Sequence, residues 1–106
     1  MLDTLDPHLA EHLRAIPHAS VATLALAYPR QVLPPALAGS GYLTPRSEGR
    51  PVRACTWVSA KWAGRAPDDA SLIRVSFGGA GMDEITNASE EDLLRLAQEE
   101  LRTVLG

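Results

Sequence analysis

Hydrophobic residues at helical spacing mark both ends of the chain. Near the N-terminus, Asp6-Pro7 is typical of a helix start, because aspartate caps a helix and proline is favoured in its first turn. Pro17 ends this helix. Near the C-terminus, Ser89 caps a second helix that has an acidic first turn. The apolar stripes are Leu5, Leu9, Leu13 and Ile16 in the first helix, and Leu93, Leu94, Ala97, Leu101, Val104 and Leu105 in the second.

Four segments between these helices have the pattern of strands. They are residues 19–28, 42–44, 52–59 and 71–78. In the first segment both the odd and the even positions hold small apolar residues, which predicts that both faces of this strand are covered by other parts of the protein. The last two alternate with a period of two, as half-buried strands do. Residues 29–41 are rich in proline and glycine and are predicted to form a loop.

The order of helix, four strands, helix predicts an α+β fold over residues 1–106, as a single domain. Most connections between the strands are short, which favours hairpins and an antiparallel sheet. We expect two helices to pack on one face of this sheet of about four strands. The predicted core comprises Leu9, Leu13, Val21, Val75, Phe77, Leu94, Leu101 and Leu105.

Composition excludes several classes of function. The chain has 106 residues, a net charge of −3 and interspersed charges, so it lacks the basic face that nucleic-acid binding requires. Cys55 is the only cysteine, which excludes an internal disulfide and favours a reducing, cytoplasmic setting. The longest apolar run is too short for a bilayer span, and no signal-peptide pattern opens the sequence.

Two motifs resemble catalytic or cofactor sites without completing them. "HLAEH", residues 8–12, has the spacing of a zinc peptidase motif, but a third protein ligand is not evident, so two solvated histidines are the better interpretation. "GGAGMDE", residues 78–84, follows a strand as a dinucleotide loop does. Its carboxylates would occupy the place of a pyrophosphate, which favours a turn. We therefore expect no catalytic residue, no metal ligand and no cofactor-binding residue in this chain.

Three traits resemble the flavin-dependent protoporphyrinogen oxidases and coproporphyrinogen III oxidases. They are a strand ending in Tyr28-Pro29, the run "GSGYLTPR" of residues 39–46, and the "SAKW" of residues 59–62 before Ala66-Pro67. In this order and at this spacing the traits are fairly specific. With the flanking helices they cover nearly the whole chain.

The resemblance implies the substrate-binding domain of such an enzyme, without its Gly-rich FAD-binding unit. The implied reaction is the six-electron oxidation of protoporphyrinogen IX or coproporphyrinogen III to the porphyrin in heme biosynthesis, in which FAD passes electrons to oxygen. The implied partners are the porphyrinogen and the FAD-binding domain of the same parent chain, while the fragment alone is expected to be inactive and to bind no FAD. The implied location is the cytoplasm, with the parent enzyme free or in contact with a membrane.

The resemblance also implies three substrate-binding positions: Ala10, Leu26 and Ser40. Ala10 lies off the leucine stripe and is expected to face a cavity. Gly39 and Gly41 are expected to let the backbone approach a flat ligand, with "SEGR" as the hairpin turn beyond them. Since two helices cover one side of a sheet, the face carrying Leu26 and Ser40 is expected to mediate a homodimer.

Two alternatives stay open. One is the substrate domain of another flavin amine-oxidase-like enzyme. Amine oxidases usually carry a lysine in the first strand, where Thr23 is the nearest polar residue here, and this favours the porphyrinogen branch. The other is a stand-alone binding or dimerisation module.

Overall fold

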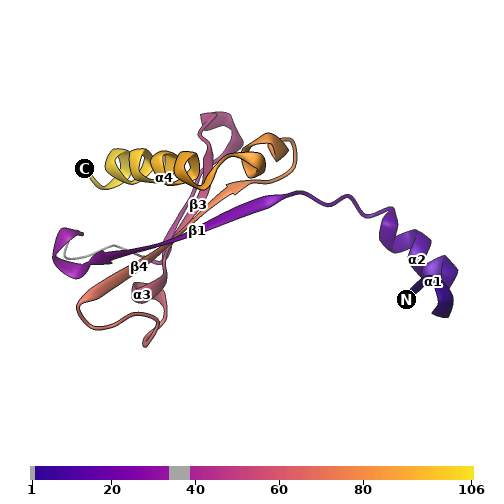
Figure 1. Ribbon diagram of the computed structural model, residues 1–106, viewed down its shortest axis with the longest axis horizontal. Coiled ribbons are helices and arrows are strands. Elements are labelled where there is room, and N and C mark those ends of the chain that lie inside the picture. Colours follow the sequence, from indigo (N-terminus) through magenta and orange to yellow (C-terminus); the bar gives the residue numbers. More distant parts are fainter. Residues whose placement is uncertain (1, 34–38) are drawn as a thin grey trace.

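The computed structural model of the chain describes residues 2–33 and 39–106 (Figure 1). The helices are α1 (Leu2–Leu5), α2 (Pro7–Arg14), α3 (Val58–Lys61) and α4 (Glu90–Leu105), with short 3₁₀ helices η1 (Arg30–Val32), η2 (Arg46–Glu48) and η3 (Asp83–Asn87). The strands are β1 (Val21–Pro29), β2 (Gly41–Leu43), β3 (Val52–Trp57) and β4 (Ala70–Gly78). The predicted loop of residues 29–41 falls partly on residues 34–38, which lie outside the described residues.

The strands form one antiparallel sheet in the order β1-β4-β3-β2, which confirms the predicted α+β class and the strand number. β1 and β4 pair along their whole length, from Val21 opposite Gly78 to Pro29 opposite Ala70. β1 and β2 are therefore the two edges of the sheet, although they are neighbours in the sequence. The third strand is shorter than predicted, because the chain turns into α3 at Val58.

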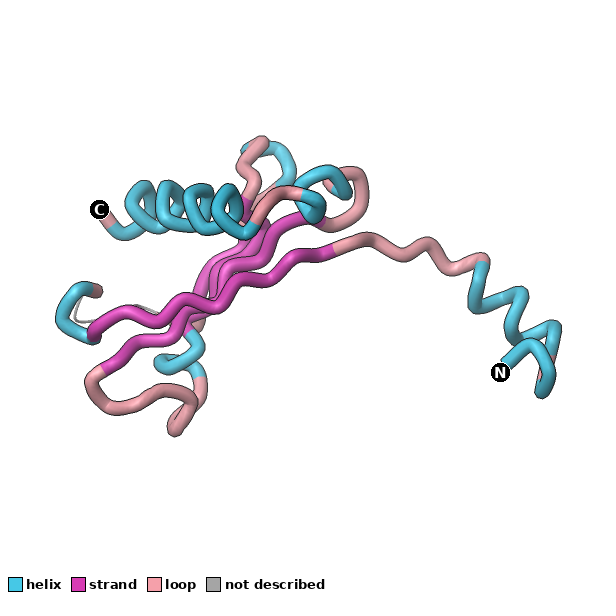
Figure 2. Tube along the Cα trace, in the orientation of Figure 1, coloured by secondary structure: helices cyan, strands magenta, loops and turns pink. Residues whose placement is uncertain are grey.

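Helix α4 covers one face of the sheet and encloses the core (Figure 2). Ile73, Val75 and Phe77 of β4 are fully buried under it. The remaining buried members of this cluster are Val52, Cys55, Trp57, Ala97 and Leu101. Val75, Phe77, Leu101 and the half-buried Leu105 confirm the predicted core, whereas Leu94 is half-buried outside this cluster. Burial of each large apolar side chain stabilises the fold by about 1.5–3 kcal/mol.

A bulge in β3 changes which side chains reach the core. Strict alternation would place Val52 and Cys55 on opposite faces of the sheet. The pairing of β3 with β4 shifts between Val52 and Ala54, so that Val52 lies opposite Phe77 and Cys55 opposite Val75. Both side chains are therefore buried on the face that α4 covers.

The first helix does not pack on the sheet, and this part of the prediction is wrong. Leu9, Leu13 and Val21 are 44%, 41% and 60% exposed, so none belongs to the core. Residues 15–20 lead from α2 into the edge strand β1 without turning back, so α1 and α2 project from the body (Figure 1). The helices form a small unit of their own, held by the Asp6 cap on the Leu9 amide and by an ion pair between Asp3 and Arg14.

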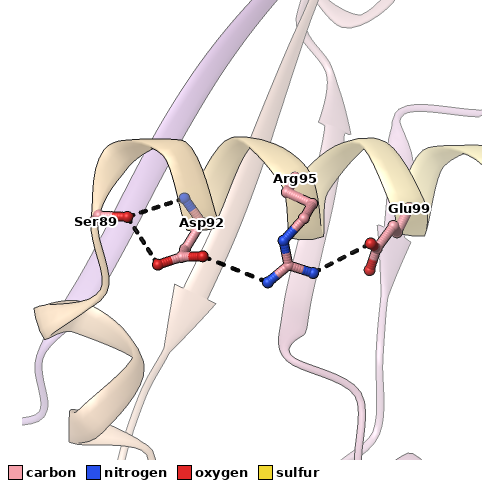
Figure 3. Close-up of polar contacts among 4 residues, drawn as sticks. All are labelled: Ser89, Asp92, Arg95 and Glu99. Atoms are coloured by element: carbon pink, nitrogen blue, oxygen red, sulfur yellow. Dashed lines mark hydrogen bonds and ion pairs between the residues drawn. The ribbon is translucent and has the colours of Figure 1, made fainter.

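The start of α4 is capped as predicted (Figure 3). The Asp92 amide donates to Ser89 Oγ at 3.1 Å, and the Ser89 hydroxyl donates back to Asp92 Oδ2 at 2.8 Å. The hydrogen bond from Ser89, aided by Arg95, holds the pKa of Asp92 below its usual value. Arg95 lies between Asp92 and Glu99 on the solvent side of the helix.

A buried polar cluster fastens the edge strand β2 to α4. The Glu100 side chain is 5% exposed, accepts a hydrogen bond from the Tyr42 hydroxyl at 2.9 Å and pairs with Arg50 at 2.9 Å. Burial and the bond to Glu100 raise the pKa of Tyr42. Burial, with the nearby Glu100 charge, raises the pKa of the Cys55 thiol to about 12. Both oxygens of the Glu100 carboxylate therefore have a partner, as a buried charge requires.

Candidate functional site

The face of the sheet opposite α4 carries small and polar side chains. The register assigns to this open face Thr23, Ala25 and Ala27 of β1, Leu72, Arg74 and Ser76 of β4, Ala54 and Thr56 of β3, and Leu43 of β2. Leu43 is 80% exposed, and Thr23, Ala25 and Ala27 are exposed as well. Figure 1 shows α3 below the sheet, on the side away from α4. Within the described parts of the chain, α3 is the only helix on this face.

A hollow of about 260 Å³ lies on the open face beside α3. It is lined by Ala25, Val58, Trp62, Arg65, Leu72 and Arg74. The Leu72 amide donates to Ser59 Oγ at 3.1 Å, which ties α3 to β4 at this point. Trp62 is 40% exposed, and Lys61 Nζ lies 4.6 Å from the centre of its ring. The hollow therefore combines an apolar floor, an aromatic wall and cationic side chains.

The structure does not bring the three predicted substrate positions together. Ala10 is 5% exposed in the projecting α1–α2 unit, where it lines a hollow together with Leu13 and His18. Leu26 is half-buried against the core, on the face that α4 covers. Ser40 is exposed at the other edge of the sheet, where its carbonyl accepts a hydrogen bond from the Trp57 amide at 3.0 Å. Leu26 and Ser40 therefore do not share a single surface within this chain, contrary to the prediction.

The glycines of the 39–50 stretch have structural reasons of their own. A side chain at Gly41 would clash with the carbonyl oxygen of Cys55, so the close pairing of β2 with β3 requires glycine there. Gly49 has a φ of 62° and ends the turn after η2, as predicted for "SEGR".

The glycine-rich segment after β4 does not fit the diphosphate of a flavin nucleotide. It forms a turn, closed by a hydrogen bond from the Met82 amide to the Gly79 carbonyl at 2.9 Å, and continues into η3. Asp83 and Glu84 occupy the first turn of η3, and Asp83 Oδ1 accepts from the Ser20 amide at 3.3 Å. Carboxylates at this place repel phosphate. The predicted turn is confirmed.

The remaining motifs lead to no site. His8 and His12 are exposed on α2. Among residues 2–33 and 39–106, no three His, Cys, Asp or Glu side chains lie close enough to share a metal ion. In the same ranges no helix is both long and apolar enough to cross a membrane.

The sequence prediction missed Arg65 and Arg74 as candidate site residues. The signal was present for Arg74, because in "SLIRVSFG" Ile73, Val75 and Phe77 form the apolar alternation and Arg74 points the other way. Arg65 lies in a loop, where no periodicity indicates direction. Trp62 lies at the rim of the hollow.

The fold is a four-stranded sheet module with one face covered by α4 and an open face that carries the hollow beside α3. Residues 2–106 match the family described as flavin containing amine oxidoreductase, and the chain belongs to this family. It is 32% identical to the coproporphyrinogen III oxidase of Bacillus subtilis over 90% of this chain, and 36% identical to that of Mycobacterium bovis over 100%. It is 28% identical to protoporphyrinogen oxidase 1, chloroplastic, of Spinacia oleracea over 99% of this chain. The chain spans about a fifth of the length of these relatives, at 20%, 23% and 20%.

Proposed function

We propose that this chain is the substrate-binding part of an FAD-dependent porphyrinogen oxidase. The observation that carries the proposal is the alignment of nearly the whole chain with relatives named coproporphyrinogen III oxidase. The reaction of the parent enzyme is the six-electron oxidation of coproporphyrinogen III or protoporphyrinogen IX to the porphyrin, with oxygen as acceptor. FAD, held by residues of the parent enzyme outside this chain, would supply this redox chemistry.

The role of this chain is to bind and orient the macrocycle with the open face. A tetrapyrrole is a flat, largely apolar ring, and the small side chains of Thr23, Ala25 and Ala27 let a flat ligand lie close to the backbone. Leu72 and Trp62 add apolar surface beside them. In the parent enzyme the open face would also meet the FAD-binding domain. Ala10, Leu26 and Ser40 remain substrate contacts proposed from the family resemblance, separate from the open face, because Leu26 lies on the face that α4 covers.

One feature disfavours an amine as the substrate. Lys61 is the only lysine of the sequence, and its ammonium lies over the Trp62 ring rather than on β1. Thr23 occupies an exposed position of β1 on the open face. The hollow itself is lined by two arginines, which would repel a protonated amine.

The proposal is tested by titrating the 106-residue chain with coproporphyrin III, the stable oxidised product, and following porphyrin fluorescence and quenching of tryptophan. We expect saturable binding to one class of sites, with no competition from benzylamine. Replacing Ala25 with Asp, on the open face, should abolish binding. Replacing Arg95 with Gln, on the solvent side of α4, should leave it unchanged. Equal binding by both variants, or competition by the amine, would argue against the proposed function.

A further inference from the structure

Arg74 lies near the centre of the open face. It is exposed on β4, with Ala25 of β1 opposite it on one side and Thr56 of β3 on the other. Among the open-face positions that the strand register pairs, Arg74 is the one charged residue. Since the neighbouring side chains are small, its guanidinium is accessible to a molecule that lies on the sheet.

The arginines of the hollow lack acidic partners. In the described residues, Arg14, Arg50 and Arg95 form ion pairs with carboxylates, whereas Arg65 and Arg74 form none. Asp68 and Asp69 are the acids nearest along the chain, and neither pairs with these arginines. Other arginines, such as Arg46, also form no ion pair in the described residues, so what distinguishes Arg65 and Arg74 is that both line one hollow.

The rest of the hollow suits a ligand that is apolar in its body and acidic at its rim. Leu72 and Val58 are half-buried apolar residues, and Trp62 offers an exposed ring. Guanidinium groups bind carboxylates in paired, charge-assisted hydrogen bonds, for which arginine geometry is suited. A flat apolar ring with carboxylates on short side chains matches both properties together.

We propose that Arg65 and Arg74 form a carboxylate subsite that selects the more highly carboxylated porphyrinogen. This inference rests on the proposed function and deepens it by naming the substrate class. Coproporphyrinogen carries propionate groups at positions where protoporphyrinogen carries vinyl groups. The two guanidiniums would bind the additional carboxylates of coproporphyrinogen and so raise its affinity, whereas the vinyl groups of protoporphyrinogen would leave the guanidiniums without a partner.

The test uses the 106-residue chain, with coproporphyrin III and mesoporphyrin IX as ligands that differ in their number of carboxylates. The variants are Arg74→Gln, Arg65→Gln and the control Arg46→Gln, an exposed arginine in η2 that forms no ion pair in the described chain. We expect the hollow variants to bind coproporphyrin about tenfold more weakly, as loss of a charge-assisted contact implies, and mesoporphyrin nearly as before. Raising the salt concentration should weaken coproporphyrin binding in the unmodified chain more than in Arg74→Gln. Circular dichroism verifies that each variant is folded.

A third ligand, benzene-1,3,5-tricarboxylate, separates this inference from the proposed function. If both porphyrins bind and the arginine variants bind coproporphyrin as well as the control does, the subsite is wrong and the proposed function stands. If no porphyrin binds but the tricarboxylate quenches tryptophan in an Arg74-dependent way, the subsite stands and the proposed function fails. Absence of binding by all three ligands overturns both.

Discussion

Replacing Leu101 with alanine tests whether α4 is docked on the sheet. Leu101 is 6% exposed and packs in the core cluster with the β4 side chains. Truncation of a buried leucine leaves a cavity in a core that relaxes only partly, at a cost of about 2–5 kcal/mol. A domain of this size has a free energy of unfolding of about 5–15 kcal/mol, so the loss is a large part of its stability. The midpoint of thermal unfolding should fall by about 10–20 °C.

Val104 provides the matched control on the same helix. It is 40% exposed, so Val104→Ala removes little buried surface and should cost about 1 kcal/mol or less. Urea unfolding followed by circular dichroism gives the free energy of both variants on one scale. If the two variants differ by less than about 0.5 kcal/mol, α4 does not pack as described and the core assignment is refuted.

Three further predictions concern the thiol, the flavin and self-association. Burial raises the pKa of the Cys55 thiol from an ordinary 9.0 to about 12, so the thiol ionises at lower pH in the unfolded chain and the free energy of unfolding should fall between those pH values. Urea titrations of Cys55→Ala should show a smaller loss of stability over this pH range. An unchanged loss in the variant would contradict the buried state of the thiol. The 106-residue chain should bind no FAD, and a yellow protein with flavin absorbance after purification would refute this. The exposed stripe of Leu9, Leu13 and Ile16 and the open face leave apolar surface uncovered, so light scattering should report a dimer at high concentration; a strictly monomeric species would oppose this.

The sequence predicted elements more reliably than their arrangement. Period-two alternation around Ile73 and the helical stripe around Leu101 identify β4 and α4, because each pattern reflects burial of one continuous face. The stripe of α2 has the same periodicity, yet the pattern does not show what covers it. The connecting residues 15–20 hold this helix away from the sheet. The N-terminal helix α1 is too short to show a period of its own.

Strand order accounts for the differences at the candidate site. Leu26 and Ser40 are near in the sequence, but the placement of β4 and β3 between β1 and β2 separates them. Single-chain periodicity carries no information on which strands are neighbours. From "SLIRVSFG", Arg74 could be assigned to the face opposite the core. That Arg74 lines the same hollow as Arg65 and Trp62 depends on how α3 folds back onto β4, which the sequence pattern does not show.

The most direct test of the central claim is a map of where a porphyrin binds on the chain. Backbone amide shifts in two-dimensional nuclear magnetic resonance spectra, recorded while coproporphyrin III is added, provide this map. We predict that the largest changes occur at Ala25, Leu72, Arg74 and Trp62, around the hollow of the open face. The outer side of α4, at Arg95 and Glu99, should change little. Changes concentrated on that side of α4, or none at saturating porphyrin, would contradict the assignment of the open face as the substrate-binding surface.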